Sequence, residues 1–254
     1  MMKMSPYAEH PVFEKPDDPD VKIWRYMDFT KFVSMLDKKA LYFTRADILA
    51  EKYDKFDSLY HPEFVERTLK LYSDKKTKKR ILHFFNGQKE FRKENIINCW
   101  HINDDESAAM WNTYSHRGYG IAIQSSFNKL VKSFDVFKEN EVHIGKVFYS
   151  IDKLQFDNAY FPFMVKRKCF EYENELRAVI LNIWSNYFKR EFDDERLSHE
   201  GEYIPVDLGV LIENIYLAPN TEKWVSNVIN SILGKYDMNV LVQPSILDRE
   251  PHYN

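Results

Sequence analysis

The fold is decided by residues 21–44, which read VKIWRYMDFTKFVSMLDKKALYFT. Aromatic and β-branched residues over 21–26 predict a short strand. Four apolar residues then recur at the helical spacing i, i+3, i+4, i+7: Phe29, Phe32, Val33 and Leu36. We therefore expect a short amphipathic helix that Asp28 or Thr30 caps. A second strand at residues 40–44 completes a strand–helix–strand unit.

Downstream of this unit the chain consists mainly of short strands. We expect strands at or within residues 96–100, 121–123, 141–149, 175–183, 203–217 and 239–242. Helices are expected within residues 62–94, at residues 126–134 and ahead of the last strand. Because clean strand–helix–strand alternation is rare, this order predicts an α+β fold, a mixed or antiparallel sheet with short packing helices, in a single domain over residues 21–254.

Two segments are expected to lie outside the packed core. Residues 1–20 hold several prolines and alternating charges, which predict a flexible leader. The polar residues 186–202 predict a long exposed loop.

Two helix starts carry capping signals. Asn103, with Glu106 three residues later, has the form of a capping box. It is expected to open a helix that carries Trp111 and Tyr114. Asn220 is expected to cap the last helix, whose apolar residues share one side: Trp224, Val225, Val228, Ile229, Ile232 and Leu233.

The composition excludes several classes of protein. The net charge of −3 gives no general attraction to nucleic acid or membranes. The 7 glycines form no Gly-rich phosphate loop, and Cys99 and Cys169 form neither a disulfide framework nor a zinc ribbon. Cys99 and His101 share a strand face, but no paired Cys or His motif accompanies them, so no metal is expected. With no apolar secretory or membrane-spanning stretch, we expect a cytoplasmic protein without a membrane partner.

The strongest local pattern is FEYENELRAVI at residues 170–180. Side chains alternate between the faces of a strand, so Glu173, Glu175 and Arg177 would share one face. Two carboxylates about 7 Å apart suit acid–base chemistry or the stabilisation of a developing cation, with Arg177 holding one of them ionised. The same pattern fits a structural ion triad, and the sequence leaves both interpretations open.

Three other patterns have both a functional and a structural interpretation. Trp111 and Tyr114 lie i, i+3 on a helix, where they would stack a base or a nicotinamide ring, or pack in the core. Arg25 and Thr44, on neighbouring strands, would bind a phosphate and a ribose. The basic cluster KKTKKR at residues 75–80 would contact phosphates, or form a solvated helix face.

Taken in order, these patterns resemble a bacterial family known as domain of unknown function 2971. Its members carry an aromatic–basic–aromatic strand, a Leu-Tyr-Phe-Ser strand, a Ser-Cys-Phe-Ser-like strand, Met-Trp-x-x-Tyr, a Gly-x-x-Ile strand and Trp-x-Tyr-Glu-x-Glu-x-Arg. The counterparts are residues 24–26 (WRY), 41–44 (LYFT), 98–101 (NCWH), 110–114 (MWNTY), 120–123 (GIAI) and 170–177 (FEYENELR), within a resemblance that spans residues 21–245. Two features depart from the family: its Asn-Asp-Pro-Phe-Glu box is degenerate here (YDKFD, residues 53–57), and Phe170 stands in place of a tryptophan.

More weakly, the chain resembles the ADP-ribosyltransferase superfamily, which has a basic residue on a first strand, a Ser or Thr on a following one and a late Glu, often in Glu-x-Glu. The resemblance implies NAD as a substrate and no metal. At the matching positions it implies that Arg25 binds the NAD phosphate, that Tyr42 or Thr44 positions the nicotinamide ribose, and that Glu175, beside Glu173, is catalytic. A carboxylate there would stabilise an oxocarbenium-like ribose.

Three functional hypotheses follow. The leading one is an NAD-consuming transferase of the ADP-ribosyltransferase type, of a toxin or phage-defence class, acting on a protein or nucleic-acid acceptor that the sequence does not identify. Trp111, Tyr114 and Arg177 would complete its cofactor site. The alternative is a non-catalytic module that recognises a nucleotide, a nucleic acid or a protein. The third is a metal-free hydrolase that uses Glu173 and Glu175, and it requires a raised carboxyl pKa.

Overall fold

The computed structural model describes residues 6–52, 62–114, 119–149, 158, 160–181 and 200–249. Its strands are β1 (Lys22–Asp28), β2 (Ala40–Arg45), β3 (Ile96–Ile102), β4 (Gly120–Ser126), β5 (His143–Lys146), β6 (Glu175–Ile180), β7 (Gly201–Pro205), β8 (Asn214–Leu217) and β9 (Leu241–Gln243). Its α-helices are α1 (Phe29–Lys38), α2 (Ala46–Lys52), α3 (Pro62–Lys70), α4 (Lys75–Lys93), α5 (Ala108–Tyr114), α6 (Phe127–Ser133), α7 (Leu208–Leu211) and α8 (Lys223–Lys235). Four 3₁₀ helices are η2 (Phe134–Val136), η4 (Phe161–Met164), η5 (Lys168–Glu173) and η8 (Ile246–Asp248). In this described part, no helix is long and apolar enough to cross a membrane.

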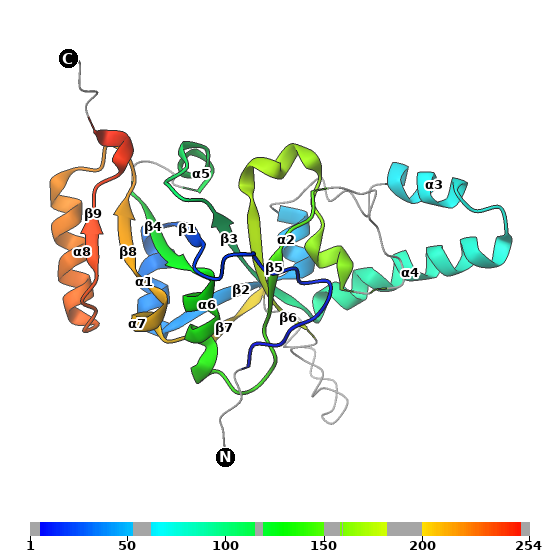
Figure 1. Cartoon of the computed structure of the whole chain (residues 1–254), viewed down its shortest axis with the longest axis horizontal. Helices are drawn as coiled ribbons and strands as arrows, with labels where there is room; N and C mark the ends of the chain where they lie inside the picture. Colours follow the sequence, from blue (N-terminus) through cyan, green and yellow to red (C-terminus); the bar gives the residue numbers. More distant parts are fainter. Residues whose placement is uncertain are drawn as a thin grey trace.

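The strands form one sheet, which Figure 1 shows with helices packed around it. Its main path runs β5-β6-β3-β1-β4-β8-β9, and β2 joins β3 while pairing with β7 on its other side. Every pairing is antiparallel except β8 with β9, which is parallel. The expected α+β fold with a mixed, mostly antiparallel sheet is therefore confirmed.

The two faces of the sheet are set by residue alternation in β1. Ile23 and Met27 belong to the large apolar cluster that also contains Phe32 and Leu36 of α1. Trp24 and Tyr26 belong to a second cluster with residues of α5. Because neighbouring strand residues point to opposite faces, α1 and α5 cover opposite faces of the sheet.

The sheet divides at β3, and this division positions the site described below. One edge of β3 pairs with β6 along residues 96–101. The other edge is shared: β1 pairs with β3 at residues 101–102, and β2 pairs with β3 at residues 96–97. Between these two pairings β1 and β2 diverge, and we call this divergence the fork.

Side chains satisfy the backbone groups that the fork leaves without a strand partner. Asn98 of β3 donates from Nδ2 to the Tyr42 carbonyl at 2.8 Å, and its Oδ1 accepts from Nε1 of Trp100 at 2.8 Å. Arg25 of β1 donates from Nη1 to the Cys99 carbonyl at 2.7 Å. Polar side chains thus bridge the fork where a continuous sheet would have backbone hydrogen bonds.

One capping prediction is confirmed and two are wrong. Asp28 caps α1, accepting from the Lys31 amide at 2.8 Å. The capping box is wrong because the Glu106 carboxylate accepts from Ser245 and Ile246, far away in sequence, and from the Trp111 indole. Helix α5 begins after it, at Ala108.

The start and the apolar side of α8 also differ from the prediction. The helix is preceded by Glu222, and Asn220 instead adopts a left-handed turn conformation with φ of 61°. Val225, Ile229 and Leu233 are buried. Trp224 and Val228, which the pattern placed on the same side, are exposed, so the buried stripe is narrower than the run of apolar residues.

The predicted leader is a further correction, since its described part is packed. Val12 and Phe13 are buried in an apolar cluster. Tyr7 forms a parallel bridge with Val142, and the Lys146 amide donates to the Glu14 carbonyl at 2.8 Å. These contacts arise from apolar residues between the prolines. Of the predicted loop, residues 186–199 lie outside the described part, and residues 201–202 belong to β7.

Gly201 of β7 lies so close to β2 that no side chain fits. A Cβ at this position would lie 2.1 Å from the Phe43 carbonyl oxygen and 2.8 Å from the Tyr42 ring. We expect Gly201→Ala to lower the free energy of unfolding by about 1–3 kcal/mol. Gly234→Ala is the matched control, because nothing lies within 4 Å of its added Cβ. Since Gly234 lies in a helix, this substitution is expected to raise the free energy of unfolding by about 0.5–1 kcal/mol. Chemical denaturation measures both, and equal effects would contradict the expected packing.

Candidate functional site

A cavity of about 480 Å³ occupies the fork, a volume in the range of small-molecule sites. Residues of β1, β2, β3 and β6 line it, together with α1 from one face of the sheet and α5 from the other. We call it the fork cavity. Its polar lining includes Arg25, Tyr42, Thr44, His101, Glu173 and Glu175. The site therefore lies where the sheet is interrupted and both of its faces are accessible to one ligand.

Arg25 is the charge in this lining that lacks a compensating partner. Its one hydrogen bond among the described residues goes to the Cys99 carbonyl, and no carboxylate in that part of the chain pairs with it. Burial lowers the pKa of the Arg25 guanidinium, although an arginine stays protonated at any physiological pH. A partly buried cation without a counter-charge is costly, and an anionic ligand in the cavity would remove that cost.

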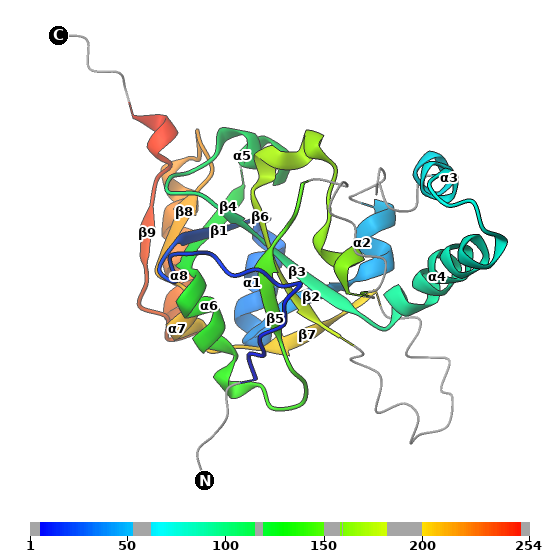
Figure 2. The ribbon, with the colours of Figure 1, turned by 45° about the vertical axis from the view of Figure 1, so that its right-hand side comes forward.

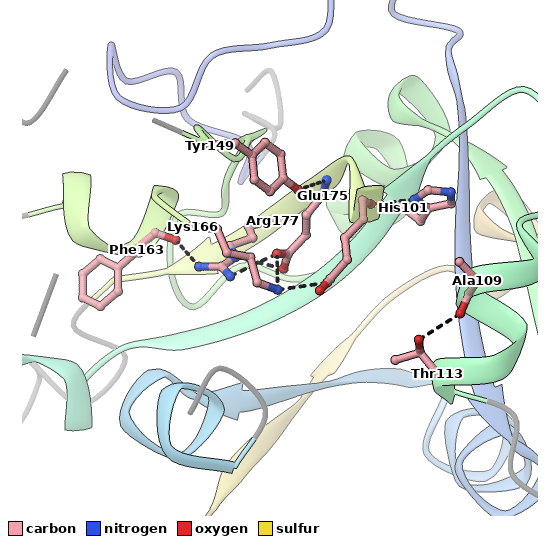
Figure 3. A network of polar contacts seen from close by, with 9 residues as sticks. His101, Ala109, Thr113, Tyr149, Phe163, Lys166, Glu175 and Arg177 are labelled. Carbon is pink, nitrogen blue, oxygen red and sulfur yellow. Dashed lines mark hydrogen bonds and ion pairs between the residues drawn. The ribbon is translucent and has the colours of Figure 1, made fainter. Parts of the chain in front are cut away.

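Glu175 belongs to a buried ionic cluster with Arg177 and Lys166 (Figure 3), which Glu173 joins through Lys166. Arg177 binds the Glu175 carboxylate bidentately, with Nε–Oε1 at 2.9 Å and Nη2–Oε2 at 3.0 Å. Lys166 donates to Glu173 Oε2 at 2.9 Å and to Glu175 Oε2 at 3.4 Å. The backbone amide of Glu175 donates to the Tyr149 hydroxyl at 2.7 Å. The charges of the two carboxylates and the two cations in this cluster therefore cancel. Among the described residues, the charge of Arg25 has no such counterpart.

Glu175 is held ionised. Burial alone would raise the pKa of its carboxyl, but the charges of Arg177 and Lys166 more than offset burial and lower that pKa from 4.5 to about 2. A group that never takes up a proton near neutral pH is unsuited to general acid–base catalysis and well suited to stabilising positive charge. This arrangement disfavours the hydrolase hypothesis for Glu175.

His101 presents an unpaired ring nitrogen beside this cluster. Its Nδ1 hydrogen-bonds the Glu173 carbonyl, which can only accept, so Nδ1 carries the proton. Nε2 is buried and has no hydrogen-bond partner among the described residues. Burial lowers the pKa of the His101 imidazole, so the ring is neutral at pH 7 and Nε2 keeps its lone pair. Among the described residues this buried acceptor therefore lacks a donor.

Tyr114 connects the two charged parts of the lining. Burial raises the pKa of its phenol, and the charges of Glu173 and Glu175 raise it further. The same side chain interacts electrostatically with Arg25. Tyr114 is therefore a neutral hydroxyl within electrostatic range of both Arg25 and the ionic cluster.

Acid stability tests this electrostatic description. Because the folded-state pKa of Glu175 is about 2 and its ordinary value is 4.5, its ionic contribution to stability is full above pH 4.5 and is lost as the pH falls towards 2. We expect the free energy of unfolding to differ between the wild type and Glu175→Gln at pH 7, and this difference to shrink through that window. Denaturant titrations at several pH values measure it, and a difference independent of pH would contradict the assigned pKa.

The structure brings together most of the site residues that the sequence singles out. Arg25, Tyr42, Thr44, Tyr114, Glu173 and Glu175 all line the fork cavity. Arg177 lies behind this lining and holds Glu175. Trp111 is buried, packs edge-on against Tyr26 and donates to Glu106 at 2.9 Å, so it forms no exposed patch with Tyr114. The degenerate box at residues 53–57 lies outside the described residues.

Three residues of the site were not expected from the sequence. Lys166 follows the apolar run 161–165, and nothing in that pattern indicates that its ammonium reaches both glutamates. Tyr149 lies in a segment expected only to be a strand. His101 was considered solely as a metal ligand, and within the described residues no group of side chains could hold a metal ion.

Comparison with known proteins does not identify the chain. No protein-family model matches it, and neither the curated proteins nor the solved structures give a match. The resemblances to domain of unknown function 2971 and to the ADP-ribosyltransferases therefore stay predictions from sequence.

Proposed function

We propose that the chain is an NAD-consuming transferase of the ADP-ribosyltransferase type, with the fork cavity as its NAD site. The observation that carries this proposal is Arg25, which lines the cavity with no carboxylate partner among the described residues. A pyrophosphate would supply the missing counter-charge. Its oxygens match the planar, two-pronged donor geometry of a guanidinium.

The rest of the lining supports a dinucleotide over a simple anion. The hydroxyls of Tyr42 and Thr44 are suited to ribose hydroxyl groups. Tyr114 and Tyr203 provide aromatic surface on which a base or nicotinamide ring can stack.

The proposed chemistry uses the ionised Glu175. The bond between C1′ of the ribose and the nicotinamide nitrogen breaks, and both electrons leave with nicotinamide, which becomes neutral. The ribose carbon gains oxocarbenium character, and a fixed carboxylate stabilises that positive charge. A nucleophile of the acceptor then bonds to C1′ and loses its proton. With water as the acceptor, the products are nicotinamide, ADP-ribose and a proton.

Nicotinamide release from NAD by the purified protein tests this function, measured beside the shift in melting temperature that NAD produces. The proposal expects both a rise in melting temperature and release of nicotinamide. If NAD neither stabilises the protein nor loses nicotinamide, the transferase proposal is wrong. If NAD stabilises the protein without release, the cavity is a nucleotide-recognition site, as the non-catalytic alternative holds.

A further inference from the structure

Helix α4 has one face that the proposed NAD site does not explain. Ile81 and Phe85, four residues apart, are buried. Lys76, Lys79, Arg80 and His83 recur at i, i+3, i+4, i+7 and are exposed. A helix repeats every 3.6 residues, so these four side chains form one stripe on the solvent side.

This stripe is strongly and uniformly basic. The helix carries eight Lys or Arg residues and one Glu, although the whole chain has a net charge of −3. Lys75, Lys76, Lys79 and Arg80 are all exposed, and none of them forms an ion pair within the described residues. Solvated helix faces usually interleave charges of both signs, so this concentration of one sign favours a ligand of the opposite sign.

The position of α4 makes the stripe accessible. Figures 1 and 2 both show α3 and α4 projecting from the body of the molecule, away from α8. Helix α4 has 19 residues and is therefore about 28 Å long. An extended partner can lie along it without meeting the sheet.

We propose that the exposed face of α4 binds the phosphodiester backbone of nucleic acid. A membrane-surface helix would present several large apolar side chains next to its basic stripe, whereas Ile81 and Phe85 are buried and Leu82 is the one exposed large apolar side chain among the described residues of α4. Lysine and arginine repeated along one side of a helix match a line of phosphates, and such contacts do not depend on base sequence. This proposal goes beyond the NAD site and does not depend on it.

Fluorescence anisotropy with a labelled RNA duplex of about 20 base pairs tests the proposal, since such a duplex is longer than α4. The test variant combines Lys75→Gln, Lys76→Gln, Lys79→Gln and Arg80→Gln. We expect it to bind at least about tenfold more weakly than the wild type. The slope of log affinity against log salt should fall by about three, because each lost phosphate contact contributes roughly 0.9.

A second variant controls for net charge. Lys38, Lys132, Lys223 and Lys235 are exposed elsewhere on the molecule, and their replacement by Gln removes the same four charges. We expect this variant to bind like the wild type. Circular dichroism and nicotinamide release, measured on all three proteins, separate loss of fold or of the proposed catalysis from loss of nucleic-acid binding.

Several results would overturn the proposal. The proposal is wrong if the wild type binds neither the duplex nor the matching single strand. It is also wrong if the α4 variant binds as tightly as the wild type. Equal losses in both variants would show a general effect of net charge. Stronger α4-dependent binding to vesicles of anionic phospholipid than to either nucleic acid would assign the stripe to a membrane surface.

Discussion

Replacing Glu175 with glutamine is expected to slow nicotinamide release from bound NAD by about 10²- to 10³-fold, the usual cost of losing one fixed group that stabilises transition-state charge. Glutamine keeps the shape of the side chain and removes the negative charge. The effect should fall on the turnover number, because the carboxylate interacts with the positive charge that develops at C1′. The affinity for NAD, measured by calorimetry, should stay close to that of the wild type.

Loss of the Glu175 charge also weakens the buried ionic cluster, so stability has to be separated from chemistry. Arg177 and Lys166 both lose a partner, and such changes cost about 3–5 kcal/mol. The assay is therefore run well below the melting temperature of the variant, with circular dichroism confirming the fold. Glu171→Gln is the matched control, because Glu171 is exposed and the chemical change is the same. Wild-type turnover in a folded Glu175→Gln protein would show that Glu175 is not the catalytic carboxylate.

Replacing Arg25 with glutamine is expected to weaken NAD binding by about tenfold to a hundredfold. Hydrogen bonds to a charged group contribute roughly 1.5–3 kcal/mol, and each 1.4 kcal/mol corresponds to a factor of about ten in affinity. Glutamine retains one donor for the Cys99 carbonyl and loses the charge that pairs with phosphate. Calorimetric titration of NAD into both proteins measures the difference.

The variant Lys22→Gln controls for the loss of one positive charge from the same strand. Lys22 is exposed, donates to the Asp104 carbonyl at 3.1 Å and does not line the fork cavity. We expect it to bind NAD like the wild type. Equal affinities for wild type and Arg25→Gln would show that Arg25 does not bind the phosphates of NAD.

Much of the fold follows from local pattern in the sequence. The periodicity of residues 21–44 predicts β1, α1 and β2 to within two residues at each end. Such patterns are reliable because each of these elements buries one face of its own residues against the core. The two helix caps that were predicted wrongly had suitable residue types. The carboxylate of Glu106, however, accepts hydrogen bonds from Ser245 and Ile246, and only the tertiary structure brings these residues together.

The candidate site could be predicted only in part. Alternation within a strand placed Glu175 and Arg177 on one face, where they form an ion pair. Glu173 lies outside the strand, in η5, because Asn174 adopts a left-handed conformation with φ of 35° and breaks the alternation. Glu173 still reaches the cluster through Lys166, a contact between two segments that no periodic pattern connects.

The fork could not be anticipated from single strands. It depends on which residues of β3 pair with β1 and which with β2, and this register is decided by packing across the whole sheet. Beside the fork, Arg25 has no carboxylate partner and His101 Nε2 has no hydrogen-bond partner among the described residues. The uncompensated charge of Arg25 in the cavity lining is what favours the proposed ligand site over a structural ion cluster.

The most direct test of the account is a crystal structure of Glu175→Gln with NAD, a variant chosen so that the glycosidic bond stays intact. We expect NAD in the fork cavity, with pyrophosphate oxygens within about 3.2 Å of the Arg25 guanidinium and the nicotinamide ribose next to residue 175. A dinucleotide bound elsewhere, or bound with its pyrophosphate away from Arg25, would contradict the account.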